Sequence, residues 1–248
     1  PSRRIITMGG DKFRDEHSLA FGGTDEYIDT GEYFHSFMQD SHSYAFWIKP
    51  TDGQPSTTHM LVGAKKDTDD YFYLAILASG KIRYYLASDG DNDLIDTSSA
   101  VFADGQTDWT HIVLSATKSA VNGFKIYING VLNTQANSNA IGSDEWGAFS
   151  TSKNIFIGCY NNADTPALFY TGGMSDFAFY NKALSASEVF SIYNNRQPFN
   201  HNDSSFRGNL VTWYRMGDGL ESGGGSTIYD MAGSNNGTLT NMDTGDIQ

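Results

Sequence analysis

The sequence is poor in cysteine and proline. The single cysteine, Cys159, cannot form a disulfide within the chain, so no disulfide framework supports the fold. Cys159 follows an apolar run at Ile155–Ile157, and we predict that it is a small buried strand residue. Only five prolines accompany 26 glycines, and aromatic residues make up 14% of the chain, a balance that suits many strands joined by tight turns.

Positive charge and long apolar runs are also scarce. Sixteen Lys and Arg residues face 29 Asp and Glu residues, which gives a formal net charge of −13. Because such a field repels phosphates, we predict that nucleic acid is not a partner. No apolar run approaches the roughly 18 residues of a membrane span, and the N-terminus lacks the apolar segment of a signal peptide. We therefore predict a soluble protein without a membrane span.

The motifs of common enzymes are missing. Glycosidases of two-sheet folds need two carboxylates on one strand face, and no Glu-x-Asp-x-x-Glu pattern occurs. Nucleophile-elbow, zincin and phosphate-loop motifs are absent as well. His111 is predicted to be a packed strand histidine and not a base. Asp89–Asp93 has the acidic spacing of an EF-hand loop, but Leu94 and Ala100 stand at its sixth and twelfth positions, so we predict a polar turn.

The clearest structural signal lies between Thr107 and Leu132. Phe124, Ile126 and Ile128 alternate with polar or amphipathic residues, which is typical of a strand with one buried face. The dipeptide Asn129-Gly130 then favours a type I′ turn, because both central residues of that turn need positive φ. We predict an antiparallel meander here.

Similar alternation predicts further strands along the chain. One helix is expected after Ser185, which forms a capping box with Glu188, and Val189 begins its apolar stripe. Trp47 lies in an alternating run and is predicted to belong to the core. The other expected strands cover residues 18–21, 27–30, 43–49, 60–64, 71–78, 81–87, 155–160, 170–180, 209–216 and 227–231.

The hairpin of residues 71–87 offers a candidate binding surface. Its apolar residues share one face, which leaves Tyr73, Arg83 and Tyr85 on the other. Such a cluster suits stacking on a sugar or on a protein surface, and ordinary cross-strand pairing explains it equally well. Trp146, in an acidic loop, is a further candidate exposed aromatic residue.

Taken together, the motifs resemble the laminin-G-like branch of the concanavalin A-like jelly rolls. This resemblance implies an all-β sandwich of two antiparallel sheets with one short helix. We predict an N-terminal arm at 1–17, the jelly roll at 18–198 and a C-terminal extension at 199–248. The matching segments are Ser18–Ile28, Phe46–Pro50, Asp108–Val113, Lys125–Gly130, Ile155–Gly158 and Phe177–Val189.

Relatives of this kind often hold a structural calcium ion between the first and last strands. The resemblance places candidate ligands at Asp25, Glu26 and Asp176, although Ser175 stands where a second carboxylate is usual. Solvated turn residues are the alternative interpretation. Calcium is the one cofactor that the sequence suggests.

The order of the segments suggests a role. A piece that often precedes the jelly roll follows it here, at 210–239, as in laminin-G-like modules of structural proteins of tailed phages. Its strands are expected to close an edge of their own sandwich or to join the edge of a neighbouring subunit.

Three functions follow from these features. We predict a non-catalytic structural or adhesion protein on a virion surface, a capsid decoration or fibre-associated protein of a phage, whose partners are other virion proteins and further copies of itself. One alternative is a calcium-dependent carbohydrate-binding module that takes glycans. The other is a degenerate glycoside hydrolase, which would need two carboxylates about 5–9 Å apart.

Overall fold

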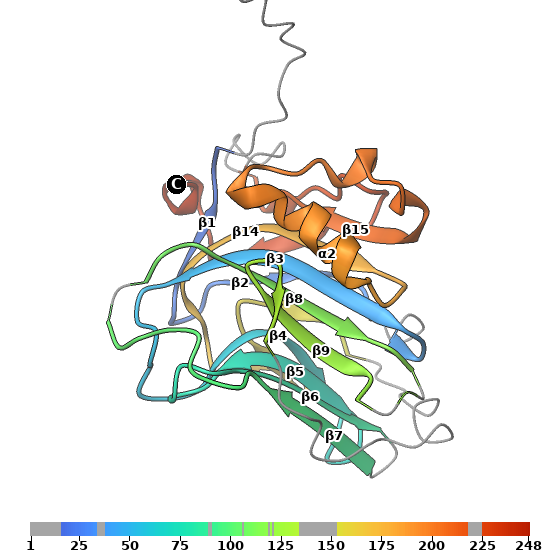
Figure 1. Ribbon diagram of the computed structural model, residues 1–248. Coiled ribbons are helices and arrows are strands. Elements are labelled where there is room, and N and C mark those ends of the chain that lie inside the picture. Colours follow the sequence, from blue (N-terminus) through green and yellow to red (C-terminus); the bar gives the residue numbers. More distant parts are fainter. Residues whose placement is uncertain are drawn as a thin grey trace, which may run out of the picture.

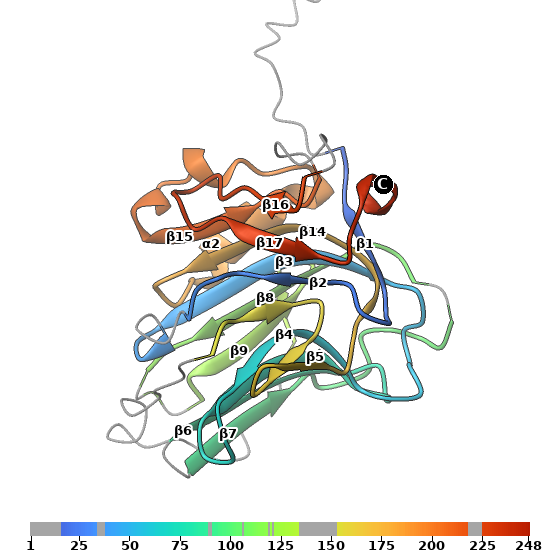
Figure 2. The same ribbon diagram turned by 180° about the vertical axis from the view of Figure 1, so that it is seen from behind.

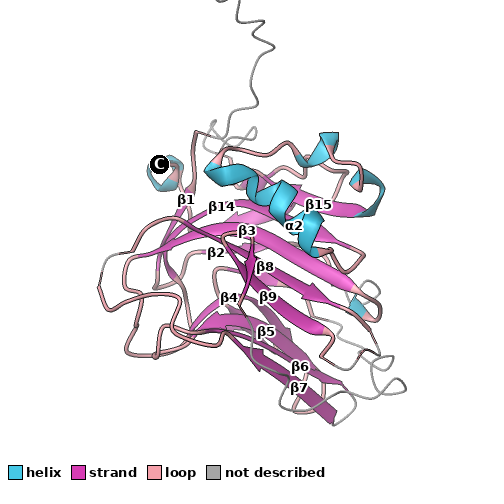
Figure 3. Cartoon of the chain, viewed as in Figure 1, coloured by secondary structure: helices cyan, strands magenta, loops and turns pink. Residues whose placement is uncertain are grey.

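The computed structural model describes residues 16–33, 38–88, 91–105, 107–118, 120, 122–133, 153–217 and 225–248. These residues form two β-sheets stacked face to face, almost entirely antiparallel (Figures 1 and 2). Among these residues, the helix α2 (Ala186–Tyr193) and several short 3-10 turns gather on one side of the sandwich (Figure 3). The all-β sandwich predicted from the sequence is confirmed.

The first sheet, sheet A, has the order β1-β14-β3-β8-β9-β10, and β15 also pairs with β14. Asn129 and Gly130 turn the chain between β9 and β10 with φ values of 50° and 79°, as a type I′ turn requires. The predicted meander is therefore confirmed. The strands are β1 (Leu19–Gly22), β3 (His42–Pro50), β8 (Thr110–Ala116), β9 (Phe124–Ile128), β10 (Val131–Leu132), β14 (Thr171–Tyr180) and β15 (Leu210–Tyr214).

The second sheet, sheet B, has the order β16-β17-β2-β11-β4-β5-β6-β7, with β12 beside β4 and β13 beside β12. The contact of β12 with β4 is parallel. Gly158, with φ of 85°, separates β11 from β12, so the single strand predicted at 155–160 is in fact two. The strands are β2 (Tyr27–Asp29), β4 (His59–Lys65), β5 (Tyr71–Ile76), β6 (Ile82–Ser88), β7 (Asp91–Asp96), β11 (Phe156–Ile157), β12 (Tyr160–Asn162), β13 (Thr165–Ala167), β16 (Thr227–Ile228) and β17 (Gly237–Thr240).

The acidic stretch after residue 90 is an edge strand, and the polar turn predicted for Asp89–Asp93 is wrong for the residues from Asp91 onward. Residues 91–96 pair with β6 along their whole length. Asp93 and Ile95 are buried, so the stretch alternates as a strand does. Its high charge suits an edge, because charged edge strands resist pairing with other chains.

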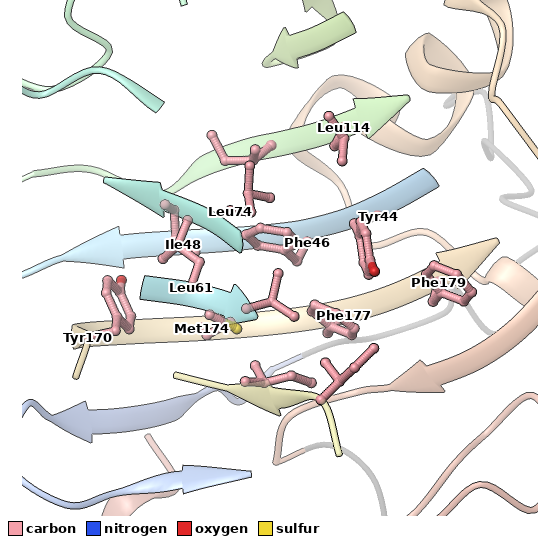
Figure 4. Packing of buried hydrophobic residues seen from close by; sticks show 14 of the residues in the cluster. Tyr44, Phe46, Ile48, Leu61, Leu74, Leu114, Tyr170, Met174, Phe177 and Phe179 are labelled. Atoms are coloured by element: carbon pink, nitrogen blue, oxygen red, sulfur yellow. The ribbon is translucent and has the colours of Figure 1, made fainter. Parts of the chain in front are cut away.

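The main core lies between the two sheets and is rich in aromatic rings. Tyr44 and Phe46 of β3 pack beside Phe177 of β14, with ring centroids 6.0 Å and 5.5 Å from that ring (Figure 4). Leu61 and Leu74 approach them from sheet B (Figure 4). Cys159 is buried, as predicted, but it lies between β11 and β12 and not within a strand.

The outer face of sheet A carries a second, smaller core. The helix α2 (Ala186–Tyr193) begins with the predicted capping box, in which Glu188 N donates to Ser185 Oγ and Ser185 N donates to the Glu188 carboxylate. It lies across sheet A together with the segments that follow it (Figure 1). Those segments include the 3-10 turns η2 (Asn194–Arg196), η3 (His201–Asp203) and η4 (Arg207–Asn209), and η6 (Thr244–Asp246) lies near the C-terminus.

One edge of β14 is shared by two strands from opposite ends of the chain. β1 pairs with residues 171–174 of β14, and β15 pairs with residues 177–180. Between them β14 bulges, and Asp176 has φ of 58°. The extra residue lets both Met174 and Phe177 point into the core, because it changes the strand's alternation by one position. In sheet B, β17 pairs with β2, so strands of the extension join both sheets of the same chain (Figure 2).

A buried hydrogen-bond network lies at this bulge. The Trp213 indole N–H donates to Asp176 Oδ1 at 2.5 Å, and His201 Nε2 lies 3.2 Å from Asp176 Oδ2. His201 Nδ1 also bonds the Tyr180 hydroxyl. All four side chains are at most 4% exposed. The network therefore fixes the extension onto β14 with polar groups that have no access to water.

The first prediction concerns the indole donor of this network. Trp213→Phe removes the N–H but keeps an aromatic ring, so a buried carboxylate loses a partner at a cost of about 1–3 kcal/mol. Urea unfolding should show that loss. The matched control is Trp47→Phe, because no described residue accepts a hydrogen bond from the Trp47 indole. Equal unfolding free energies for the two variants would contradict the prediction.

Candidate functional site

The outer face of sheet A has a covered half and an open half. The covered half lies under α2 and the extension, where Ala45, Val113 and Ala178 are buried. The open half is a groove of about 1160 Å³ over β1, β14, β3 and the start of β8. It is the candidate site, because the fold leaves this part of a sheet face without a protein layer.

Small residues form the floor of the groove. The pairing register places Ala20 of β1, Gly173 of β14 and Lys49 of β3 in one row. A Cβ atom at Gly173 would come within 2.8 Å of the six-membered end of the Trp109 indole. A larger residue at 173 would displace the Trp109 ring, because the indole lies directly over the backbone there.

Two tryptophans line the groove above this floor. Trp109 precedes β8, and because β3 lies between β8 and β14, its side chain reaches across β3 to Gly173. Trp47 of β3 stacks on Tyr193 of α2, with ring centroids 5.9 Å apart and an interplanar angle of 28°. Both indoles are partly exposed. The prediction that Trp47 belongs to the core is therefore wrong, because α2 ends beside it instead of covering it.

Residues 196–198, in the chain after α2, form a wall of the groove. Asn194, Asn195 and Arg196 all have positive φ, at 46°, 52° and 67°. Left-handed backbone is uncommon for non-glycine residues and costs roughly 1–2 kcal/mol at a residue such as arginine. Asn194 stabilises the turn, because its side-chain amide donates to Pro198 O and its carbonyl accepts from Gln197 N.

Several polar groups of the groove have no partner among the described residues. These groups are the indole N–H of Trp47 and of Trp109, the ammonium of Lys49 and the guanidinium of Arg196. All of them are hydrogen-bond donors. Three carboxylate side chains line the groove among the described residues. Asp108 and Glu16 are exposed, and Asp176 is buried in the network with Trp213.

His111 lies beneath the tryptophan side of the groove. It is 1% exposed, with its ring 4.9 Å from Trp47 and 5.9 Å from Tyr193. Burial lowers the pKa of His111 to about 3, so the ring is neutral at physiological pH. The prediction of a packed strand histidine is confirmed.

The surface predicted on the 71–87 hairpin is assembled as expected on the outer face of sheet B, but its rings cover one another. Tyr85 stacks between Tyr71 and Tyr73, with centroids 5.1 Å and 5.3 Å away and planes within 9° of parallel. Arg83 makes a bidentate ion pair with Asp96, at 2.7 Å and 2.9 Å. Both faces of Tyr85 are thus occupied by other rings. Trp146 lies outside the described residues.

Two of the three predicted calcium ligands accept hydrogen bonds from N–H groups of the protein. Both oxygens of Asp176 receive the N–H groups of Trp213 and His201. Glu26 Oε2 accepts from the backbone of Thr24 and Asp25. No group of three or more His, Cys, Asp or Glu residues in the described part of the chain could hold a metal ion. Asp25, Glu26 and Asp176 thus stay predicted calcium ligands, for which backbone carbonyls or water would supply the other oxygens.

The geometry defines a β-sandwich with an open, tryptophan-lined groove on one sheet. The family model of the concanavalin A-like lectin/glucanases superfamily, in its laminin G form, matches residues 21–190. The chain therefore belongs to this family. The match ends inside α2, so the segment that supplies the Arg196 wall lies beyond it. No curated protein matches the chain.

Several solved structures share the fold. A putative carbohydrate-binding protein from Bacteroides ovatus has a TM-score of 0.62 at 19% identity, covering 94% of this chain and 58% of that one. The chain thus matches little more than half of that protein. The CBM40 of the Ruminococcus gnavus IT-sialidase, bound to α2,6-sialyllactose, has a TM-score of 0.55 at 16% identity, covering 73% and 100%.

A heptameric SAP-like pentraxin from Limulus polyphemus has a TM-score of 0.50 at 16% identity, covering 71% of this chain and 81% of that one. At these identities the likeness shows the fold. In the described ranges, no helix combines the length and the apolar character needed to cross a bilayer.

The second prediction concerns the pH dependence of stability. Burial lowers the pKa of His111 to about 3 and that of His42 to about 4, from an ordinary value of 6.5. A proton then binds the unfolded chain more tightly, so this stability is fully present above about pH 6.5 and is lost as pH falls toward 4.

His111→Phe removes one of these buried histidines and keeps a ring beside Trp47. Its unfolding free energy should fall less steeply between pH 6.5 and pH 4, by up to about 1.4 kcal/mol per pH unit. Chemical unfolding at several pH values measures both curves. Parallel curves for variant and parent would show that His111 is not a buried neutral histidine.

Proposed function

We propose that the chain is a non-catalytic glycan-binding module and that the sheet A groove is its binding site. The observation that carries this proposal is the pair of partly exposed tryptophans over a floor of small residues. A sugar ring has an apolar face of C–H groups and a rim of hydroxyls. It can pack on Trp109 and Trp47 while its hydroxyls accept hydrogen bonds from the unpartnered donors of the groove.

The electrostatics of the groove support binding without catalysis. Glycoside cleavage needs a proton donor and a second carboxylate close to the glycosidic bond. Asp176, the one buried carboxylate of the groove, is 4% exposed, and each of its oxygens is hydrogen-bonded to an N–H group of Trp213 or His201, so it is engaged in the interior. The carbohydrate-binding proteins among the structural neighbours support the same function.

The tyrosine cluster on sheet B is a weaker sugar platform than the groove. Stacking needs a free ring face, and Tyr85 has none. The guanidinium of Arg83 is likewise committed to Asp96. We therefore assign glycan binding to sheet A and treat the tyrosine ladder as cross-strand packing that stabilises the hairpin.

The third prediction compares these two surfaces. Trp109→Ala and Trp47→Ala should each weaken glycan binding about tenfold or more, since each removes about 1.4 kcal/mol or more of ring contact. Tyr85→Ala is the control and should bind like the parent. A glycan array identifies the sugar, and calorimetry then measures the affinities. Loss of binding in Tyr85→Ala alone would move the site to sheet B.

A separate part of this experiment tests whether binding depends on calcium. Binding is measured in the presence of calcium and again after chelation with EGTA. Because Asp176 and Glu26 are engaged by N–H groups, we expect equal affinities. A loss of binding after chelation would instead support the predicted calcium site.

The second candidate role is adhesion at a virion surface, which rests on the order of the sequence segments and not on the groove. A glycan-binding module carried on a particle would give that particle affinity for a coated cell. The predicted arm cannot be placed for this purpose, because residues 1–15 lie outside the described residues. Co-sedimentation of the purified chain with particles that lack it tests this role, and failure to associate would remove it.

A further inference from the structure

We propose that the groove selects glycans that carry one acidic sugar, and that Lys49 and Arg196 recognise its negative group. This inference rests on the glycan-binding function proposed above and names the class of ligand. It follows from the charges of the groove, which differ from those of the rest of the chain.

The exposed charges of the groove are balanced in an acidic protein. The chain has 29 acidic and 16 basic residues, and the groove is lined by two basic side chains and three acidic ones, of which only Asp108 and Glu16 are exposed. The third carboxylate, Asp176, is 4% exposed and bonded to Trp213 and His201. The network that attaches the extension therefore also covers this carboxylate.

The two cations come from different parts of the fold. Lys49 projects from β3, in the row that contains Gly173 and Ala20, so it lies on the floor beside Trp109. Arg196 comes from the wall, at the end of the left-handed run. Neither makes an ion pair with a described residue, whereas Lys66, Arg83, Lys153 and Lys182 all do.

The conformation of Arg196 supports a binding role. A non-glycine residue with φ of 67° is strained, and such strain is concentrated at functional sites, where the surrounding structure holds it. Here Asn194 holds the turn through its bonds to Gln197 and Pro198. The strain places a guanidinium on the groove wall, where a planar carboxylate or sulfate can accept two hydrogen bonds from it.

The exposed carboxylates Asp108 and Glu16 limit the class of ligand. A polyanion that filled the groove would meet both of them as well as the overall charge of −13. A mostly neutral glycan with a single acidic unit avoids this repulsion. Its neutral sugar packs on Trp109, and its anion reaches Lys49 and Arg196.

The fourth prediction compares matched pairs of sugars by calorimetry in 150 mM salt. The probes are 3′-sialyllactose and lactose 3′-sulfate against lactose, and cellobiouronic acid against cellobiose. At least one acidic sugar should bind about tenfold more tightly than its neutral partner. The three acidic probe sugars show whether a sialic acid, a sulfate or a uronic acid is the recognised source of the charge.

Substitutions assign the preference to the two cations. Lys49→Gln and Arg196→Gln should each lose about tenfold in affinity for the acidic sugar and stay within about twofold for the neutral one. Lys125→Gln is the matched control, since it removes the same charge from the same sheet outside the groove. Equal losses at Lys125 would show a general charge effect and overturn the proposal.

The remaining outcomes separate this inference from the proposed function. Equal binding of acidic and neutral sugars, lost in Trp109→Ala, would overturn the acidic preference and leave the glycan site in place. No binding of any sugar would overturn both. Acid preference that survives both Lys49→Gln and Arg196→Gln would overturn the assignment of the two residues.

Discussion

The shared edge of β14 is the constraint on which the rest of the structure depends. β1 covers only the first part of that edge, and β15, from the far end of the chain, completes it. The bulge at Asp176 allows both pairings and sends a carboxylate toward the outer face. There the Trp213 and His201 N–H groups surround it, so that the extension is attached by β-pairing and by a fully buried polar network.

This attachment divides the outer face of sheet A. Where α2 and the extension lie, the face is packed as a second core, and where they end, Trp47, Trp109 and the small residues of β1 and β14 remain open. The same segment that closes one half builds a wall of the other through Arg196. The groove thus exists because α2 and the extension cover only part of the outer face of sheet A. Asp176, a carboxylate of the groove, is buried because Trp213 of the extension donates a hydrogen bond to it.

The sequence predicted the parts of the fold that depend on local patterns. Alternation identified β3, β5, β6, β8 and β9, the Asn129-Gly130 turn had the required φ values, and the Ser185 capping box was found in α2. It failed for β7, because the composition of an acidic edge strand resembles that of a turn.

The site was harder to predict than the fold. Alternation places Trp47 on one face of β3, but it does not show whether that face is covered, and this depends on where α2 ends. Trp109, Gly173 and Arg196 come together only in the folded chain, from three segments of the sequence. The bulge at Asp176 could not be predicted from the sequence either. Its positive φ arises where β14 pairs with β1, β3 and β15 in different registers.

The central claim is that the open half of sheet A binds glycan through its two tryptophans. A ¹⁵N-labelled chain has four tryptophan indole signals, and a titration with a glycan that binds can follow all of them. The signals of Trp47 and Trp109 should move together while that of Trp213, bonded to Asp176 in the interior, stays in place. If only the backbone signals of Tyr73 and Tyr85 on sheet B shifted while the indole signals did not move, the account would be contradicted.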